Sequence, residues 1–211
     1  MTDRRVLYVI GCGARPAADL PEFAAWSISQ GWDTCVILTP SALKFGDPTR
    51  LAEVTGHPAR SDYKRPEEPD VLPAPDAFAV APCTFNTVGK WAAGISDTLA
   101  LGLLNEALGA GRPIVAVPNP HVDLAKHPAF GRNVEFLRGC GVQVLFDPER
   151  YPLPDGSNDP RAIFPWDALK NAVREMRSHV ADLPTTWTAR SRAGLIGTAL
   201  CRSGPDLHTC P

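Results

Sequence analysis

The sequence predicts a fold of the α/β class, in which helices cover both faces of a parallel sheet. Short apolar runs alternate along the chain with segments whose apolar residues recur at helical spacing. The apolar runs are continuous, which is typical of strands that are buried on both faces. This succession favours a three-layer architecture, and 211 residues are enough to bury a sizeable core within one domain.

The first half of the chain contains two predicted strands, each followed by a helix. Residues 6–10 form an uninterrupted apolar run that ends at Gly11, and we expect a strand there. Residues 20–30 carry apolar side chains at helical spacing and predict the first helix. A second apolar run at residues 34–38 predicts the next strand, and a short helix is expected near residues 41–45.

The second half continues the same alternation. Residues 77–81 predict a third strand, and residues 88–109 predict a helical segment because apolar side chains recur there every three or four positions. The remaining elements, in order, are a strand at 114–117, a helix at 129–137, a strand at 142–146 and a helix at 166–179. Each strand after the first therefore needs a crossover connection, which favours parallel pairing.

Two proline-rich segments interrupt this alternation. Residues 56–75 and 147–165 contain charges, prolines and few apolar side chains, so we expect surface loops. Loops of this length within a domain are usually functional or disordered. Residues 184–211 lack periodicity, and we expect a tail, mobile or packed on a neighbouring subunit, after a domain at residues 1–183.

Composition excludes several classes of function. The 21 basic and 23 acidic side chains nearly balance, so no charge excess indicates a nucleic-acid or membrane partner. The first apolar run is too short for a signal peptide or a membrane span, and we expect a cytoplasmic protein. The six cysteines include no Cys-x-x-Cys pair, so we expect free thiols and no bound metal.

Glycines and small polar residues follow three predicted strands at the point where each strand ends. Gly-Cys-Gly-Ala follows the first strand, Thr-Pro-Ser-Ala the second, and Thr-Phe-Asn-Thr the third. Ligands of open α/β sheets bind at the carboxyl ends of strands, so we expect these segments to border one crevice. The glycine turn has two interpretations, because it could admit a phosphate or simply allow tight packing.

The same segments resemble a known family. Three motifs follow one another in the chain: Gly-Cys-Gly-Ala, then Thr-Pro-Ser-Ala-Leu-Lys-Phe, then Ala-Pro-Cys-Thr-Phe-Asn-Thr-Val-Gly-Lys-Trp-Ala-Ala-Gly-Ile-Ser-Asp-Thr-Leu. This succession is similar to that of the homo-oligomeric flavin-containing cysteine decarboxylases. That family includes phosphopantothenoylcysteine decarboxylases and the peptidyl-cysteine decarboxylases of ribosomal peptide biosynthesis. The resemblance spans residues 6–146 and implies a flavodoxin-like, Rossmann-like fold that binds FMN and forms a homotrimer or a dodecamer.

The resemblance also implies a set of residues that contact FMN. By position these are Cys12, Gly13 and Ala14 through their backbone, then Ser41, Thr84, Phe85, Asn86, Thr87 and Asn119. For Asn86 a helix cap is an alternative or additional role, since asparagine is favoured ahead of a helix.

On the substrate side the chain departs from the family pattern. The asparagine that holds the substrate carboxylate is replaced by His121, which can also donate a hydrogen bond to a carboxylate. The position of the family's active-site histidine is occupied by Glu68, and the nearest histidine is His57. Glu68, His57 and His121 are therefore the catalytic candidates. The alternatives are a solvated Glu68 carboxylate and a loop histidine without a role at position 121.

The resemblance implies FMN-dependent oxidative decarboxylation of a cysteine carboxylate. The second loop lacks the cysteine of the phosphopantothenoylcysteine enzymes, which favours the C-terminal cysteine of a precursor peptide as substrate and an aminoenethiol as product. The implied mechanism is hydride transfer from cysteine Cβ to the flavin, giving a thioaldehyde that drives loss of the carboxylate. The second loop is expected to close over the peptide end.

Three alternatives remain open from the sequence. The chain could bind FMN without decarboxylase activity, in a regulatory or interaction role. It could act on phosphopantothenoylcysteine, or it could be a flavin enzyme with a different acid substrate.

Overall fold

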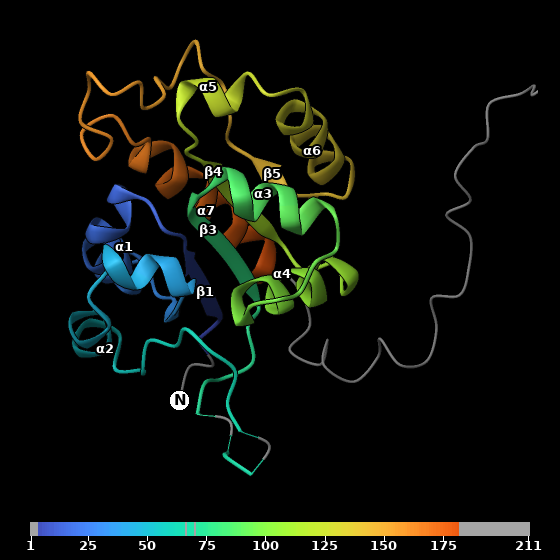
Figure 1. The fold of residues 1–211 in the computed structure, drawn as a ribbon. Coiled ribbons are helices and arrows are strands. Elements are labelled where there is room, and N and C mark those ends of the chain that lie inside the picture. Colours follow the sequence, from blue (N-terminus) through green and yellow to red (C-terminus); the bar gives the residue numbers. More distant parts are fainter. Residues whose placement is uncertain (1–3, 66, 70, 182–211) are drawn as a thin grey trace, which may run out of the picture.

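Five parallel strands form the central sheet of the computed structural model, which describes residues 4–65, 67–69 and 71–181 (Figure 1). They are Val6–Gly11 (β1), Asp33–Leu38 (β2), Ala77–Cys83 (β3), Ile114–Pro118 (β4) and Gln143–Val144 (β5). The strand order is β2-β1-β3-β4-β5. Because β2 and β3 flank β1 on opposite sides, the chain changes direction across the sheet at β1, and ligand crevices of such sheets form at this switch point.

Helices cover both faces of the sheet, as the flavodoxin-like prediction requires (Figure 1). One layer holds Phe85–Ala92 (α3), Leu99–Gly109 (α4) and Pro128–Gly139 (α6), and the other holds Leu20–Ser29 (α1), Pro48–Thr55 (α2) and Trp166–Ala181 (α7). Along β1, Tyr8 and Ile10 pack in the first layer, whereas Leu7 and Val9 pack in the second. This burial on both faces explains why the strands are continuous apolar runs. The predicted fold class is confirmed.

The prediction of one helical segment over residues 88–109 was wrong in its extent. The structure has two helices there, α3 and α4, separated by residues 93–98. Gly94 adopts a left-handed conformation with φ of 71°, which an α-helix cannot continue through. The hydroxyl oxygen of Thr98 then accepts the N–H of Leu101 at 3.3 Å and caps α4. Apolar periodicity continues across the break because both helices pack on the same face of the sheet.

Short elements complete the fold. They are the 3₁₀ helices Arg15–Asp19 (η1) and Pro40–Lys44 (η2), and the one-turn helix Val122–Ala125 (α5). The sequence reasoning anticipated η2 but neither α2, η1 nor α5. For α2 a signal was present, because Asp47 precedes a proline at the first helical position and Gly56 follows the last one.

Several residues of the loop at residues 56–75 bind to the rest of the protein, and Arg60 and Tyr63 are two of them. Arg60 lies beside the edge strand β2, where its carbonyl accepts the N–H of Leu38 at 2.7 Å. Tyr63 donates its hydroxyl to the Thr98 carbonyl at 3.1 Å and lies against Gly102 of α4. The expected tail at residues 184–211 lies outside the described residues. Within residues 4–65, 67–69 and 71–181, every helix is too short or too polar to cross a membrane.

Candidate functional site

A cavity of about 610 Å³ opens at the carboxyl ends of β1, β2, β3 and β4. It is bordered by the turns that follow these strands and by the first residues of α3 and α4. The lining includes Gly13, Ala14, Thr39, Ser41, Thr84, Phe85, Asn86, Thr87, Lys90, Thr98, Asn119 and His121. The structure thus brings together eight of the nine residues predicted to contact the cofactor, together with His121.

The turn after β1 packs closely against the turn after β2. A Cβ atom added at Gly13 would lie 2.7 Å from Ser41 Cβ and 3.1 Å from the Ser41 carbonyl carbon and oxygen. Real Cβ atoms essentially never approach so closely, so any side chain at this position would push the two turns apart. Of the two interpretations of the glycine turn, tight packing therefore applies at Gly13, and this packing also places Ser41 in the cavity wall.

The amino end of α3 forms a second part of the wall. The helix cap is Thr84, whose hydroxyl oxygen accepts the N–H of Thr87 at 3.3 Å and lies 3.0 Å from the Thr87 hydroxyl. The alternative role of Asn86 as the helix cap is therefore wrong. The Asn86 side chain is exposed in the cavity wall, and among the described residues its carboxamide has no hydrogen-bond partner. It is available to a ligand.

Asn119, directly after β4, offers a second free carboxamide. Its backbone N–H donates to the Cys83 carbonyl at 2.8 Å, which fixes the residue against the end of β3. The residue is only 9% exposed, yet within the described part of the chain its side chain makes no hydrogen bond. Asn119 lines the cavity, so its carboxamide is available to a polar ligand there.

His121 and Lys90 are the basic side chains that line this cavity. The Nδ1 atom of His121 accepts the N–H of Asp123 at 3.3 Å and caps α5, so in the neutral ring the proton is on Nε2. Nε2 is then a hydrogen-bond donor. Lys90 forms an ion pair with Asp97. Sequence reasoning did not single out Lys90, although its spacing of four residues from Asn86 places both on one helix face.

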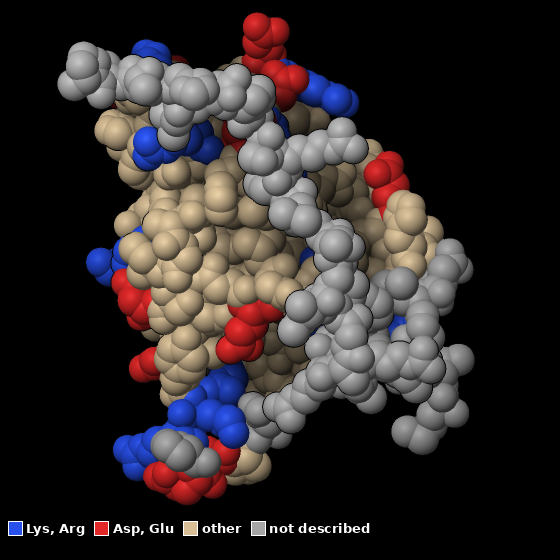
Figure 2. All heavy atoms as spheres, turned by 90° about the vertical axis from the view of Figure 1, so that its right-hand side faces the viewer, with Lys and Arg blue, Asp and Glu red and all other residues tan. Residues whose placement is uncertain are grey.

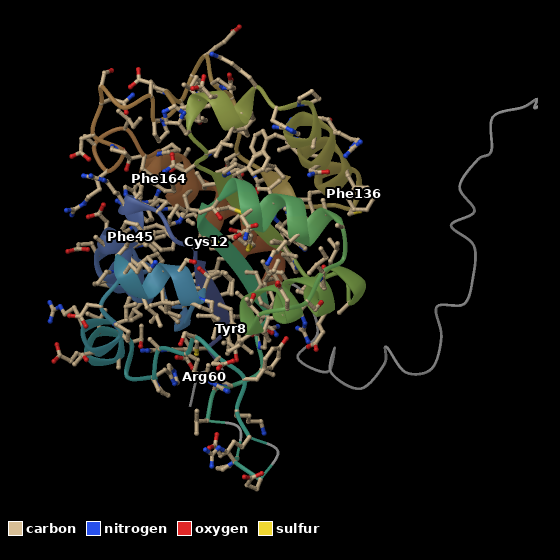
Figure 3. All side chains as sticks on the ribbon, in the orientation of Figure 1. Tyr8, Cys12, Phe45, Arg60, Phe136 and Phe164 are labelled. Carbon is tan, nitrogen blue, oxygen red and sulfur yellow. The ribbon has the colours of Figure 1, made fainter. Side chains whose placement is uncertain are left out.

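Cys12 lies beneath the cavity and does not line it. Figure 3 shows it near the centre of the fold, and both Cys12 and Cys83 are fully buried. A hydrogen bond with the Cys83 thiol lowers the pKa of Cys12, and the same bond together with burial raises the pKa of Cys83. The Cys12 N–H donates to the Pro82 carbonyl at 3.1 Å and its carbonyl accepts the Ala14 N–H at 2.8 Å. Both backbone polar groups of Cys12 thus make hydrogen bonds within the protein.

Two catalytic candidates lie away from the cavity in this chain. His57 Nε2 lies 2.7 Å from Oδ1 of Asp33, the first residue of β2, at the amino end of the sheet. The cavity is at the carboxyl end of the same strand, roughly 17 Å further along at about 3.3 Å per residue. Glu68 is exposed, and its carboxylate accepts the backbone N–H of Arg65 at 3.1 Å. The alternative of a solvated charge describes Glu68 as it stands in the single chain.

Comparison with known proteins places this cavity in a family context. The family model described as "Flavoprotein" matches residues 5–178. One curated relative, a cysteine/cysteine sulfinic acid decarboxylase from an unknown prokaryotic organism, is 36% identical over 104 residues, which are 46% of this chain and 28% of the relative. The coenzyme A biosynthesis bifunctional protein CoaBC of Bacillus subtilis (strain 168) is 31% identical over 130 residues, 59% of this chain and 31% of that protein. The chain thus spans about a third of the length of these relatives.

Solved structures match over a larger share of both chains. The FMN-dependent cysteine decarboxylase TvaF from thioviridamide biosynthesis superposes with a TM-score of 0.62 and 27% identity, covering 80% of this chain and 98% of that one. The FMN-dependent cysteine decarboxylase SpaF gives a TM-score of 0.58 and 27% identity, covering 81% and 98%. The FMN binding protein AtHal3 has a TM-score of 0.65 at 18% identity, covering 83% and 98%, and supports the fold alone.

Proposed function

Because the chain belongs to the Flavoprotein family, we propose that it decarboxylates a cysteine carboxylate with the help of FMN, and that its substrate is a peptide ending in cysteine. The cofactor is FMN, as the sequence predicted, and the resemblance to cysteine decarboxylases is confirmed. The observation that carries the proposal is the cavity at four strand ends, in a chain whose likeness to two FMN-dependent cysteine decarboxylases extends over nearly their whole length.

The residues of the cavity fit a flavin. Its volume of about 610 Å³ is in the range of small-molecule and cofactor sites. Asn86, Asn119 and Ser41 offer polar side chains that are not hydrogen-bonded within the described chain, and the first N–H groups of α3 border the same space. These groups would hold FMN, which supplies a two-electron acceptor next to the substrate.

His121 is the residue we assign to the substrate carboxylate. It follows Asn119 in the cavity wall, and its Nε2–H can donate to a carboxylate oxygen. The loop at residues 147–165 is attached to the same place, because the Pro154 carbonyl accepts the N–H of Val122 at 2.8 Å. A peptide end held at His121 would be covered by this loop, which excludes water from the reaction.

The net reaction balances with the flavin as the oxidant. The cysteine residue loses its carboxylate as carbon dioxide and gives up two electrons and a proton, and an enethiol remains on the peptide. The chain contributes orientation of the Cα–Cβ–S unit and hydrogen bonds to the carboxylate.

We also propose that the chain works as an oligomer, a homotrimer or a dodecamer. The face that carries α4 and α6 is largely uncharged across its middle, with charged side chains above and below (Figure 2). Phe136 is 52% exposed at the outer edge of α6, where Figure 3 shows it. A neighbouring subunit on such a face would bury exposed apolar side chains. It could also bring the acid/base group that the loop at residues 56–75 does not supply within one chain.

The placement of His57 and Glu68 outside the cavity favours a second candidate function. With neither group in the cavity wall, an FMN-binding protein without decarboxylase activity fits the single chain equally well. Anaerobic reaction of the FMN-loaded protein with peptides ending in cysteine separates the two. Bleaching of the flavin band, together with loss of carbon dioxide and two hydrogens from the peptide by mass spectrometry, is expected for the decarboxylase.

Peptides ending in serine are the matched control, because they keep the carboxylate and lack the thiol. His121→Asn should retain most of the rate, since an amide also donates to a carboxylate, whereas His121→Ala should lose it. If no cysteine-ending peptide bleaches the flavin, the decarboxylase proposal fails and the binding role stands.

A further inference from the structure

A second cavity, of about 620 Å³, adjoins the flavin cavity and shares His121 as a common wall residue. Its other walls come from Arg15 at the start of η1 and from the loop at residues 147–165. Ala14 lines the first cavity and Arg15 lines the second, so the turn after β1 separates the two spaces. A substrate that reaches the flavin past His121 has room to continue into the second cavity.

Arg15 is a cation without a partner in this wall. It is exposed, and within residues 4–65, 67–69 and 71–181 its guanidinium makes neither an ion pair nor a hydrogen bond. Arg161, in the same wall, is by contrast held by Asp19, whose two carboxylate oxygens lie 3.0 and 3.1 Å from its Nε. Arg161 is therefore neutralised, and Arg15 is the cation that remains available to a ligand.

Asn158 is another polar residue in the wall of this cavity. Asn158 donates its amide to the Leu153 carbonyl at 2.9 Å, but its side-chain oxygen is buried and lacks a hydrogen-bond donor among the described residues. Because this oxygen is shielded from solvent, a ligand in the cavity does not reach it. The contact that the cavity offers to a ligand is therefore the Arg15 guanidinium, which suits an anionic group.

We propose that Arg15 binds a second, non-reacting anionic group of the substrate, in the residue that precedes the cysteine. This inference rests on the proposed function for the identity of the substrate. The reacting carboxylate is a poor partner for Arg15, because its charge disappears on decarboxylation and a strong ion pair would stabilise the ground state. An anion that survives the reaction gains binding energy without this penalty.

The negative groups near the cavity limit where the anion lies. Asp159 also lines it, and its carboxylate accepts the backbone N–H of Arg161 at 3.0 Å. Asp159 and Arg161 also line a neighbouring cavity, whereas His121 is shared with the flavin cavity. The anion accordingly lies on the side of Arg15 and His121, next to the reacting end of the substrate.

Binding of unreactive peptides to the FMN-loaded protein tests the subsite independently of catalysis. The affinities of peptides ending in Glu-Ser, Gln-Ser and Lys-Ser are compared by isothermal titration calorimetry. In a second comparison, the affinity of phosphopantothenoylcysteine is measured against that of its dephosphorylated form under anaerobic conditions. We expect Glu-Ser to bind about tenfold more tightly than Gln-Ser, with a difference that shrinks as salt rises. Arg15→Gln should remove this preference and Arg15→Glu should shift it to Lys-Ser. Arg132→Gln, an exposed arginine of α6, is the matched control and should change nothing.

Each outcome decides the proposal. An Arg15-dependent preference for Glu-Ser supports it, and an Arg15-dependent preference for the phosphorylated compound supports the subsite with phosphate as its anion. Equal binding of each pair to the unmodified protein, or a preference that survives Arg15→Gln, overturns it. Failure of decarboxylation with cysteine peptides affects the proposed function alone, because the serine peptides report binding only.

Discussion

Gly13→Ala is the substitution that best tests how the cavity wall is built. The added Cβ would lie 2.7 Å from Ser41 Cβ, whereas ordinary contacts of this kind begin at 3.4 Å, so the two turns must separate by about 0.7 Å. Rotation of the Ser41 side chain cannot relieve the contact, because the Ser41 carbonyl carbon and oxygen are also only 3.1 Å away. Such overpacking costs about 1–3 kcal/mol, partly offset by about 0.4–1 kcal/mol from the stiffer unfolded chain.

Two measurements follow from this balance. The apoprotein should unfold roughly 2–8 °C lower in a thermal melt followed by circular dichroism, from a net cost of about 1–2 kcal/mol. Because Ser41 moves out of place in the wall, the Kd for FMN, measured by fluorescence quenching, should rise about tenfold or more.

The control variant is Gly109→Ala at the end of α4, where an added Cβ meets nothing within 4 Å. It should leave FMN binding unchanged and should not lower the melting temperature. The reasoning is refuted if Gly13→Ala binds FMN as tightly as Gly109→Ala does.

Three further predictions concern the loops and the edge of the sheet. Alanine favours a helix more than glycine does, so Gly102→Ala should stabilise the protein by about 1 kcal/mol when Tyr63 is also replaced by alanine. With Tyr63 present the gain should nearly vanish, because the added Cβ would collide with the Tyr63 hydroxyl. Equal changes in the free energy of urea unfolding in both backgrounds would contradict this. Hydrogen bonds from the Ser157 amide and hydroxyl hold the pKa of Asp155 below its ordinary value of 3.8. These bonds therefore stabilise the loop fully above pH 3.8, and the stabilisation is lost as the pH falls through the lowered pKa of Asp155. Asp155→Asn should therefore lower the hydrogen-exchange protection of Ser157 at pH 7, and unchanged protection would count against the assignment. His57→Asn should cost about 1 kcal/mol of stability yet leave FMN affinity unchanged, and an altered affinity would link this distant edge to the cavity.

The strands and the strand-end motifs could be predicted from the sequence because their signals are local. A continuous apolar run has few other uses in a chain of this composition, so β1, β2, β3 and β4 were located to within two residues. β5 was placed correctly but is shorter than predicted. The parallel order brings the three predicted strand-end motifs to one cavity. Asn119, which was assigned from the family resemblance, lies in the same cavity.

What could not be predicted depends on contacts between distant segments. The pairing of His57 with Asp33 joins a loop to the opposite end of β2, and nothing in the spacing of these residues indicates it. The ion pair of Asp19 with Arg161 joins residues 142 positions apart, and local spacing does not indicate it either. The break between α3 and α4 was missed because apolar periodicity reports the buried face and not the continuity of the helix.

The buried thiols of Cys12 and Cys83 give the chain an internal reporter of local opening. Both lie under the cavity floor at the ends of neighbouring strands and are inaccessible to an alkylating reagent in the closed state. Their rate of labelling therefore measures how often the ends of β1 and β3 separate. Comparison of that rate with and without FMN would give the free energy by which the cofactor holds this part of the sheet closed, without any substitution in the chain.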